Sequence, residues 1–242
     1  MAWVDQLLVV PAIGVLCEPI WDLPTRIWPA LRTVCGTWDR TTIAGAPDKP
    51  GKLQLERADG LVLDVDVQNI VCKFGYKLKL SNVGPFPSLE PPDLQPYTEL
   101  LAMVADTFTA LASALGPLGS RMERIGILAD CNVTLDELPP GANGFVERLK
   151  GVPRGGRMSA ATAALTSVLD ERDDCLDRCH YTLEAQTLAD PRVRLKLDWQ
   201  RVWSPPRTLT PSDLAQSVRD SVDAALQHFE AFGADELGAG VE

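Results

Sequence analysis

Residues 52–67 read KLQLERADGLVLDVDV, in which apolar side chains alternate with polar ones on both sides of Asp59-Gly60. Leu53 and Leu55 precede that dipeptide, and the alternation resumes after it at Leu61. Residues two apart on a strand point to the same face of a sheet, and Asp-Gly is typical of tight hairpin turns. The segment therefore predicts a β-hairpin with one buried and one exposed face.

The alternation continues beyond the hairpin, but its phase changes. The apolar residues then occupy even positions from Ile70 to Leu80, and a period of two can change phase only at a turn or a bulge. We therefore expect a turn or bulge at Gln68-Asn69, followed by a strand to residue 80. Residues 84–96 contain five prolines in thirteen positions, which predicts an extended connection.

Two segments have the period of long amphipathic helices. Residues 97–115 place apolar side chains three and four positions apart, and residues 210–232 follow the same spacing after a Thr-Pro-Ser-Asp start that is typical of a helix N-terminus. Shorter helices are predicted over residues 23–35 and 136–150. We expect the two long helices to cover mostly antiparallel sheet, which gives an α+β fold.

Further strands are predicted over residues 7–15, 123–133, 175–187 and 192–203 from their apolar patterns. Residues 159–169 are ambiguous, because alanine favours helix whereas threonine and valine favour strand. The order of elements settles the preference for strand. Residues 1–117 and 118–233 then both read strand, helix, strands and long helix, which predicts a tandem pseudo-repeat within one domain of residues 1–233. Residues 234–242 are expected to form a flexible acidic tail.

The composition limits the classes of partner. A formal net charge of −10 and a pI near 4.7 argue against nucleic acid or an anionic membrane as the main partner. The longest apolar run, residues 7–17, is too short to span a bilayer. The six cysteines are expected to be reduced, which together with the absence of a secretory segment predicts a cytoplasmic protein. Arginine outnumbers lysine 16 to 7, a bias that suggests a bacterial source.

Several side-chain groups could carry chemistry, although each also has a structural interpretation. Asp64 and Asp66 share a strand face and have the spacing of a divalent-cation site, but a solvated strand face shows the same pattern. Lys73, Lys77 and Lys79 could form an anion-binding stripe, or the lysines could form cross-strand ion pairs with the two aspartates.

Cysteine and histidine chemistry receives little support. Cys175, Cys179 and His180 are three candidate zinc ligands where four are needed, and a strand places His180 on the face opposite both cysteines. Cys131 has no histidine near it in the sequence that could act as the base of a nucleophilic cysteine. The chain also lacks the common catalytic and nucleotide-binding motifs. We therefore expect no cofactor, no metal and no catalytic residue.

The interaction candidates are loops and tryptophans. Arg154 and Arg157 lie in a glycine-rich segment that could bind an anion, although a solvated loop is the simpler interpretation. The six tryptophans exceed what one core requires, so some of them are expected at a groove or partner surface, with Trp199 and Trp203 as candidates. The proline-rich segments 84–96 and 204–207 are candidate partner contacts.

Two families share this order of elements. Arg124-Ile125-Gly126-Ile127 after a long amphipathic helix resembles a functionally uncharacterised bacterial α+β family of similar length, a resemblance that implies no active-site residues. The tandem pattern is also similar to gyrase-inhibitor-like βαββ ligand-binding domains, in which a pseudo-twofold groove receives a ligand. That second resemblance implies a groove between the halves, although the acidic groove residue of those domains has no assigned counterpart here.

Three functions remain as expectations. The first is a non-catalytic binding or adaptor protein of a bacterial assembly, with a protein as partner. The second is a sensor that binds a small molecule in a groove between the halves. The third is a carboxylate- or metal-dependent enzyme that uses residues such as Asp64 and Asp66.

Overall fold

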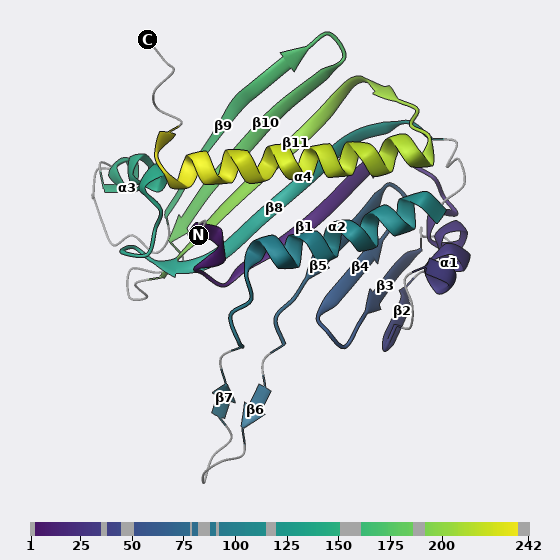
Figure 1. Cartoon of the computed structure of the whole chain (residues 1–242), viewed down its shortest axis with the longest axis horizontal. Helices are drawn as coiled ribbons and strands as arrows, with labels where there is room; N and C mark the ends of the chain where they lie inside the picture. The colour runs from purple at the N-terminus through teal and green to yellow at the C-terminus, as the bar shows by residue number, and fades with distance from the viewer. Residues whose placement is uncertain are drawn as a thin grey trace.

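The chain folds around one large antiparallel sheet, which confirms the predicted α+β class. The computed structural model describes residues 3–34, 38–44, 51–77, 79–81, 88–90, 92–114, 120–150, 161–185 and 192–236. In sheet order the nine strands are β2 (Arg40–Ala44), β3 (Lys52–Glu56), β4 (Leu61–Val65), β5 (Asn69–Phe74), β1 (Val9–Cys17), β8 (Met122–Thr134), β11 (Arg192–Arg207), β10 (Cys175–Ala185) and β9 (Ala161–Arg172) (Figure 1).

The remaining elements connect or flank these strands. A separate two-stranded sheet is formed by β6 (Lys79–Ser81) and β7 (Ser88–Glu90). The helices are η1 (Trp3–Asp5), α1 (Leu23–Val34), α2 (Tyr97–Ala114), η2 (Pro140–Ala142), α3 (Asn143–Lys150) and α4 (Pro211–Gly233).

The hairpin predicted from residues 52–67 is present as β3 and β4. Gly60 in its turn has a φ of 101°, a backbone conformation that favours glycine. The expected phase change is a turn, since the Asp66 amide donates to the Asn69 carbonyl between β4 and β5. Local turn chemistry therefore fixes the register of three consecutive strands.

Some boundaries differ from the prediction. β5 ends at Phe74 rather than near residue 80, because its partner β4 begins opposite it at Leu61, and the bond from the Gly75 amide to the Gly60 carbonyl is the last one before the hairpin turn. α3 begins at Asn143, after the 3-10 turn η2, and not at residue 136. The edge strand β2 was not predicted at all. The ambiguous segment is a strand, β9, which runs from Ala161 to Arg172.

The C-terminal helix α4 begins as its sequence predicts. The Thr210 hydroxyl accepts a bond from the Asp213 amide, while the Asp213 carboxylate accepts one from the Thr210 amide. This reciprocal capping box satisfies backbone donors that the first turn of a helix leaves unpaired. Pro211 at the first helical position removes another such donor.

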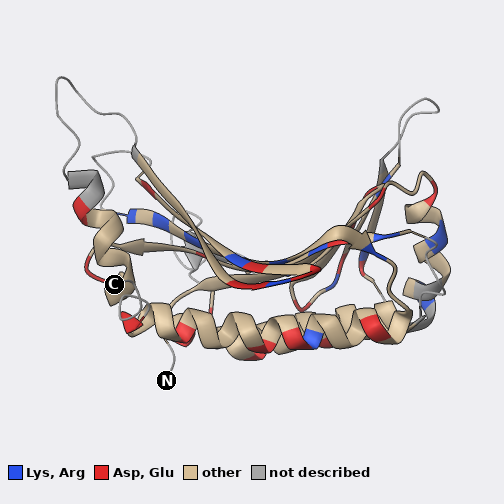
Figure 2. Cartoon of the chain, turned by 90° about the horizontal axis from the view of Figure 1, so that it is seen from above, with Lys and Arg blue, Asp and Glu red and all other residues tan. Residues whose placement is uncertain are grey.

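The two long helices lie on the same side of the sheet. α2 contacts β1 and β5, α4 contacts β8 and β11, and the helices contact each other. Figure 2 shows both helices along one side, while the ends of the sheet bend away from them. The opposite side is concave and carries no helix in the part of the chain that the structure describes; we call it the open face.

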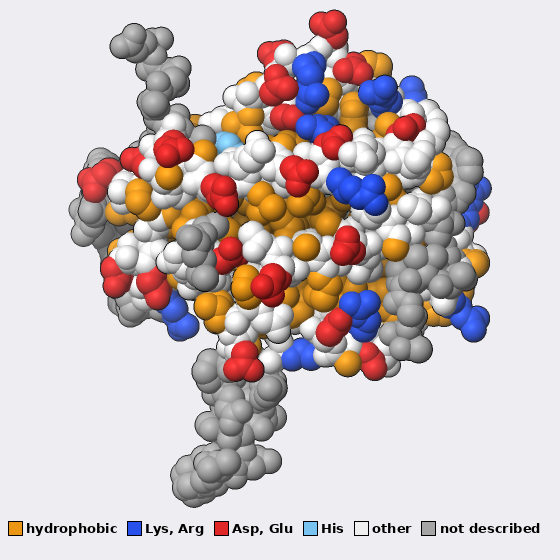
Figure 3. Space-filling model, in the orientation of Figure 1, with side chains coloured by type: hydrophobic (Ala, Val, Ile, Leu, Met, Phe, Trp, Pro, Cys, Tyr) orange, Lys and Arg blue, Asp and Glu red, His pale blue; other side chains and the backbone are white. Residues whose placement is uncertain are grey.

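The core lies between the helices and the sheet. Alternate residues of the central strands point into it, including Ile13 and Val15 of β1 and Ile125 and Ile127 of β8, and all four are buried. Seen from the helix side, charged side chains border an apolar band along the helices (Figure 3). The other strand residues face the open side.

Candidate functional site

The centre of the open face is hollowed where two glycines meet. Gly14 of β1 pairs directly with Gly126 of β8. Both glycines, like the even-numbered residues on either side of them in these two strands, lie on the open face. The hollow has a volume of about 170 Å³. Its lining consists of Ala12, Gly14, Val15, Leu16, Asn69, Val71, Arg124, Gly126, Leu128, Lys196, Asp198 and Gln200. We call this space the central hollow.

Neither glycine is required by the backbone. A Cβ atom on Gly14 would lie 3.5 Å from Cγ2 of Val71, and one on Gly126 would lie 3.5 Å from Oδ1 of Asp198, both ordinary contact distances. Neither residue has a positive φ. Because a side chain would fit at either position, the strands do not require glycine for steric reasons. The absence of two side chains is what forms the floor of the central hollow.

A polar network converges on Gln200, which is only 4% exposed. Its Oε1 accepts bonds from Nε and Nη2 of Arg178 at 3.1 and 3.0 Å, from Nη1 of Arg124 at 3.4 Å, and from Nε2 of His180 at 3.2 Å. Its Nε2 donates to Asp198 at 2.9 Å. Three strands, β8, β11 and β10, therefore meet at one amide group.

The tautomer of His180 follows from this network. Nε2 faces an acceptor, Oε1 of Gln200, so this nitrogen carries the proton. Nδ1 is then the acceptor of the 2.6 Å bond with the Thr166 hydroxyl of β9. The chain Thr166, His180, Gln200 and Asp198 extends from the edge of the sheet to the central hollow.

Cations around the central hollow are incompletely neutralised. Among the described residues, neither Arg124 nor Arg178 forms an ion pair, and the Lys196 ammonium has no polar partner. By contrast, Arg194 on the same face holds Asp130 through two bonds of 2.8 and 2.5 Å. Asp198 is the one carboxylate in the lining of the central hollow. The centre of the open face is thus locally basic in an acidic chain.

A second hollow adjoins the first on the outer strands. It has a volume of about 340 Å³ and is lined by Thr42, Lys52, Leu53, Gln54, Asp64, Val65, Asp66, Asn69 and Val71. Asn69 and Val71 line both hollows, so the depression extends from β11 toward β2. We call this second space the outer hollow.

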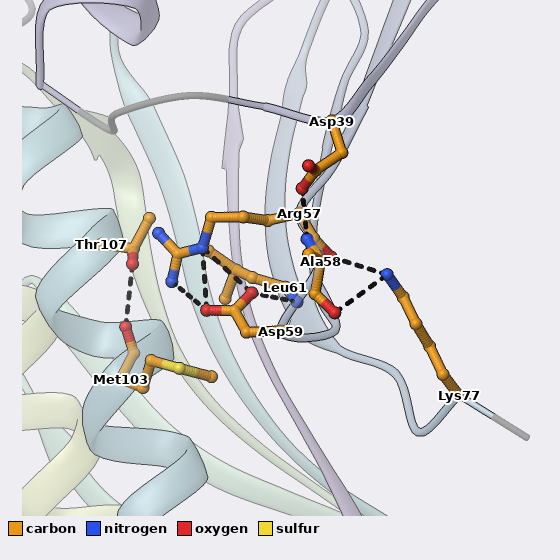
Figure 4. Close-up of polar contacts among 8 residues, drawn as sticks. All are labelled: Asp39, Arg57, Ala58, Asp59, Leu61, Lys77, Met103 and Thr107. Atoms are coloured by element: carbon orange, nitrogen blue, oxygen red, sulfur yellow. Dashed lines mark hydrogen bonds and ion pairs between the residues drawn. The ribbon is translucent and has the colours of Figure 1, made fainter. Parts of the chain in front are cut away.

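The three predicted lysines do not form a stripe. Nζ of Lys73 bonds Asp64 at 2.6 Å, the cross-strand pair that we gave as the alternative. Lys77 lies beyond the end of β5, where its ammonium donates to the carbonyls of Arg57 and Ala58 at 2.9 and 3.1 Å (Figure 4). The side chain of Lys79 lies outside the described residues. The placed lysines therefore have structural partners.

The hairpin turn beside Lys77 is itself tied together by charge. Nη2 of Arg57 contacts Asp59 at 2.6 Å, and this guanidinium lowers the pKa of the Asp59 carboxyl (Figure 4). The Asp39 carboxylate accepts a bond from the Ala58 amide. These contacts hold the hairpin turn in place.

The candidate tryptophans belong to the core. Trp199 is 1% exposed and Trp203 is 5% exposed, and both lie on the helix side of β11. The expectation that they line an interaction surface is therefore wrong, because their parity on the strand turns them inward. Trp21, at 74%, is the most exposed tryptophan in the described part of the chain. Arg154 and Arg157 lie outside the described residues.

The candidate metal ligands are occupied by protein partners. Asp64 pairs with Lys73, and Asp66 accepts bonds from the amides of Gln68 and Asn69 and from the Asn69 side chain. Within the described ranges, no group of three or more His, Cys, Asp or Glu residues could hold a metal ion. The sheet places His180 on the open face and Cys175 and Cys179 on the other, as the strand pattern predicts.

The described cysteines are buried thiols. Burial raises the pKa of Cys17 to about 11 and the pKa values of Cys131 and Cys179 to about 12. A thiolate is the nucleophilic form, so these side chains are protonated and unreactive at neutral pH.

Sequence reasoning did not identify Gly14, Gly126, Arg124, Arg178 or Gln200 as site residues. One signal was present, because each glycine interrupts an apolar strand directly after an isoleucine. In the part of the chain that is described, no helix is long and apolar enough to cross a membrane. No family model, curated protein or solved structure matches this chain.

Proposed function

We propose that this chain is a non-catalytic binding protein that receives a small molecule in the central hollow. The observation that carries the proposal is the direct pairing of Gly14 with Gly126 at the floor of a polar-lined depression. Glycine within a strand costs stability relative to alanine, and it is found where another group approaches the backbone closely. A bound molecule supplies that group.

The order of strands supports a pseudo-repeat about this point. In the first half, the last strand of the large sheet, β5, lies beside the first strand, β1, and the intervening strands continue outward. In the second half, β11 lies beside β8 in the same manner, followed by β10 and β9. We infer two related halves, 1–117 and 118–233, that join at β1 and β8. The central hollow lies at this junction.

The lining favours binding over catalysis. Among the twelve residues that surround the central hollow there is no cysteine, serine or histidine, and the polar groups are one carboxylate, two amides and two cations. Such a set fixes the orientation of a ligand through hydrogen bonds and charge. A volume of about 170 Å³ accommodates a small molecule, and a longer one extends into the outer hollow across Asn69 and Val71.

A small-molecule library tests this function on the whole chain. Compounds that raise the melting temperature should lose their effect in Gly14→Val and Gly126→Val variants, which fill the central hollow. The matched control is Thr182→Val, which changes a residue of the same face on β10 that lines neither hollow. Binding that persists in both glycine variants, or a library without any binder, would contradict the proposal.

A protein partner is a second candidate, supported by the edge strand β9. This strand is 12 residues long, and Leu165, Val168 and Leu169 are 40%, 59% and 37% exposed. No charged residue occurs between residues 161 and 169. Natural edge strands are usually protected by charge, proline or short length, so a long apolar edge fits the addition of a partner strand.

The adaptor function predicts a stoichiometric partner when the tagged chain is expressed at its native level. A Val168→Lys variant should lose that partner, whereas Ile43→Lys on the opposite edge strand, β2, should keep it. Recovery of monomeric chain alone would count against this candidate.

A further inference from the structure

We propose that the ligand of the central hollow carries an anionic group, a carboxylate or a phosphate, which Arg124 and Arg178 bind beside Gln200. This inference rests on the proposed small-molecule function and adds the chemical class of the ligand.

The amide oxygen of Gln200 has more donors than it can satisfy. An amide oxygen has two lone pairs, yet four N–H groups of Arg124, Arg178 and His180 lie within 3.4 Å of it. A carboxylate or phosphate has more acceptor sites and a formal negative charge, and its bonds to guanidinium groups are stronger than those of a neutral amide. Gln200 therefore gathers the two arginines without neutralising them.

Both guanidinium groups retain donors for a ligand. Each carries five N–H groups, of which Arg124 uses one and Arg178 uses two in contacts with Gln200 among the described residues. The two side chains come from β8 and β10, on either side of β11. An anion above Gln200 can contact both arginines at once, a geometry that planar guanidinium forks favour.

The local charge contrasts with that of the whole chain. Arg124 and Lys196 line the central hollow together with one carboxylate, Asp198, and Arg178 adjoins it through Gln200, while the complete sequence has a formal charge of −10. Two other cations of this face are paired, Arg194 with Asp130 and Lys73 with Asp64. In a chain rich in acids, arginines that contact an amide instead of a carboxylate leave a positive field for an anion.

Asp198 sets the orientation of the amide. It accepts the bond from Nε2 of Gln200, so Oε1 must point toward the arginines. Its own charge opposes the binding of an anion, because it lines the same hollow. Replacing it with asparagine should therefore tighten anion binding while the amide remains oriented.

The test is a titration of the full-length chain with inorganic phosphate and, separately, with acetate, in sodium chloride of matched ionic strength. Nuclear magnetic resonance follows the side-chain amide of Gln200 and the Nε–H groups of the arginines. We expect saturable shifts that an Arg124→Gln/Arg178→Gln double variant weakens by about tenfold or more. Asp198→Asn should tighten binding. An Asp130→Asn/Arg194→Gln variant, which preserves net charge, should bind as the wild type does.

The possible outcomes distinguish a failure of the anionic ligand class from a failure of the small-molecule binding function. Shifts with acetate alone identify a carboxylate, and shifts with phosphate alone identify a phosphate. Equal shifts with chloride, or shifts unchanged in the double arginine variant, overturn the anionic class. If neutral or cationic compounds bind and lose binding in Gly14→Val and Gly126→Val, the small-molecule function holds and the anionic class is wrong.

Discussion

Gly14 of β1 and Gly126 of β8 are partners in the register of the two central strands, and together they form the floor of the central hollow. Their paired positions leave two adjacent places on the open face without a side chain, at the junction of the proposed halves. A single glycine would leave only half of this width, because the neighbouring strand would still carry a side chain. The depression is therefore a property of the pair.

Alanine at either central glycine should stabilise the fold. The added methyl meets atoms at 3.5 Å or more, and alanine loses less conformational freedom on folding than glycine does. We expect the free energy of unfolding to rise by about 0.5 to 1 kcal/mol for Gly14→Ala and for Gly126→Ala, measured by urea denaturation.

Gly60 provides the matched control. It has a φ of 101°, and a Cβ there would lie 2.7 Å from the Gly75 carbonyl oxygen. Gly60→Ala should lower the free energy of unfolding by more than about 1 kcal/mol. If Gly14→Ala and Gly126→Ala were as destabilising as Gly60→Ala, the fold itself would require the two central glycines. That result would contradict the proposal that they leave space for a ligand.

Features encoded by adjacent residues could be predicted from the sequence. The Asp59-Gly60 hairpin and the Thr210 capping box depend on contacts within a few positions, so pattern and turn chemistry identify them. The end of β5 was misjudged because the alternation of apolar residues continues through Tyr76, beyond the point where the strand leaves the sheet.

The site could not be predicted in the same way. Arg124 and Gln200 are 76 residues apart, and they meet only because β8 pairs with β11. The tryptophans were wrongly expected at an interaction surface because the chain contains so many of them. The alternation of side chains along β11 instead places Trp199 and Trp203 in the core. The periodicity of the sequence gives the face of the sheet on which each residue lies. The order of the strands decides which residues on that face become neighbours.

The buried thiols should resist modification in the folded chain. Cys17, Cys131 and Cys179 have pKa values raised by burial to about 11 or 12, and Cys72 and Cys175 are buried as well. In a Cys35→Ser variant, the remaining five thiols should fail to react with Ellman's reagent at pH 8 and should all react after unfolding in urea. Rapid reaction of a thiol without denaturant would show that its burial is wrong.

His228 should make stability depend on pH. Its ring shares a 2.6 Å hydrogen bond with the Tyr181 hydroxyl, and burial lowers its pKa from 6.5 to about 4. The unfolded chain therefore binds this proton more readily than the folded chain, so the stabilising contribution is complete above pH 6.5 and is lost as the pH falls toward 4. The loss is up to about 3 kcal/mol.

A comparison of variants isolates this effect from the titration of carboxylates. The difference in free energy of unfolding between wild type and His228→Gln should shrink as the pH falls from 7 to 4, because glutamine does not titrate. His180→Gln, which removes the other of the two histidines of the chain, is the variant with which the His228→Gln profile is compared. A constant difference for His228→Gln would show that His228 is not held neutral by burial.

The buried ion pair of Asp177 and Arg201 should be the most sensitive charged contact on the helix side of the sheet. Asp177 is 6% exposed and accepts bonds from Nε and Nη2 of Arg201 at 2.9 and 2.8 Å, with a third from Arg172 at 2.9 Å. Removing Arg201 leaves the buried Asp177 charge with only the half-exposed Arg172 as its counter-charge. Arg201→Gln should therefore lower the free energy of unfolding by about 3 kcal/mol.

Arg207 on the same strand is the control for Arg201. Its contact with Asp174 is 3.4 Å long, and both side chains are 58% exposed, so Arg207→Gln should cost less than about 1 kcal/mol. An Asp177→Asn/Arg201→Gln double variant should recover part of the loss, because neither charge then remains buried alone. Urea denaturation of the wild type, Asp177→Asn, Arg201→Gln and the double variant measures the coupling. Equal losses for Arg201→Gln and Arg207→Gln would contradict the burial of the Asp177 charge, since solvent would then screen both pairs alike.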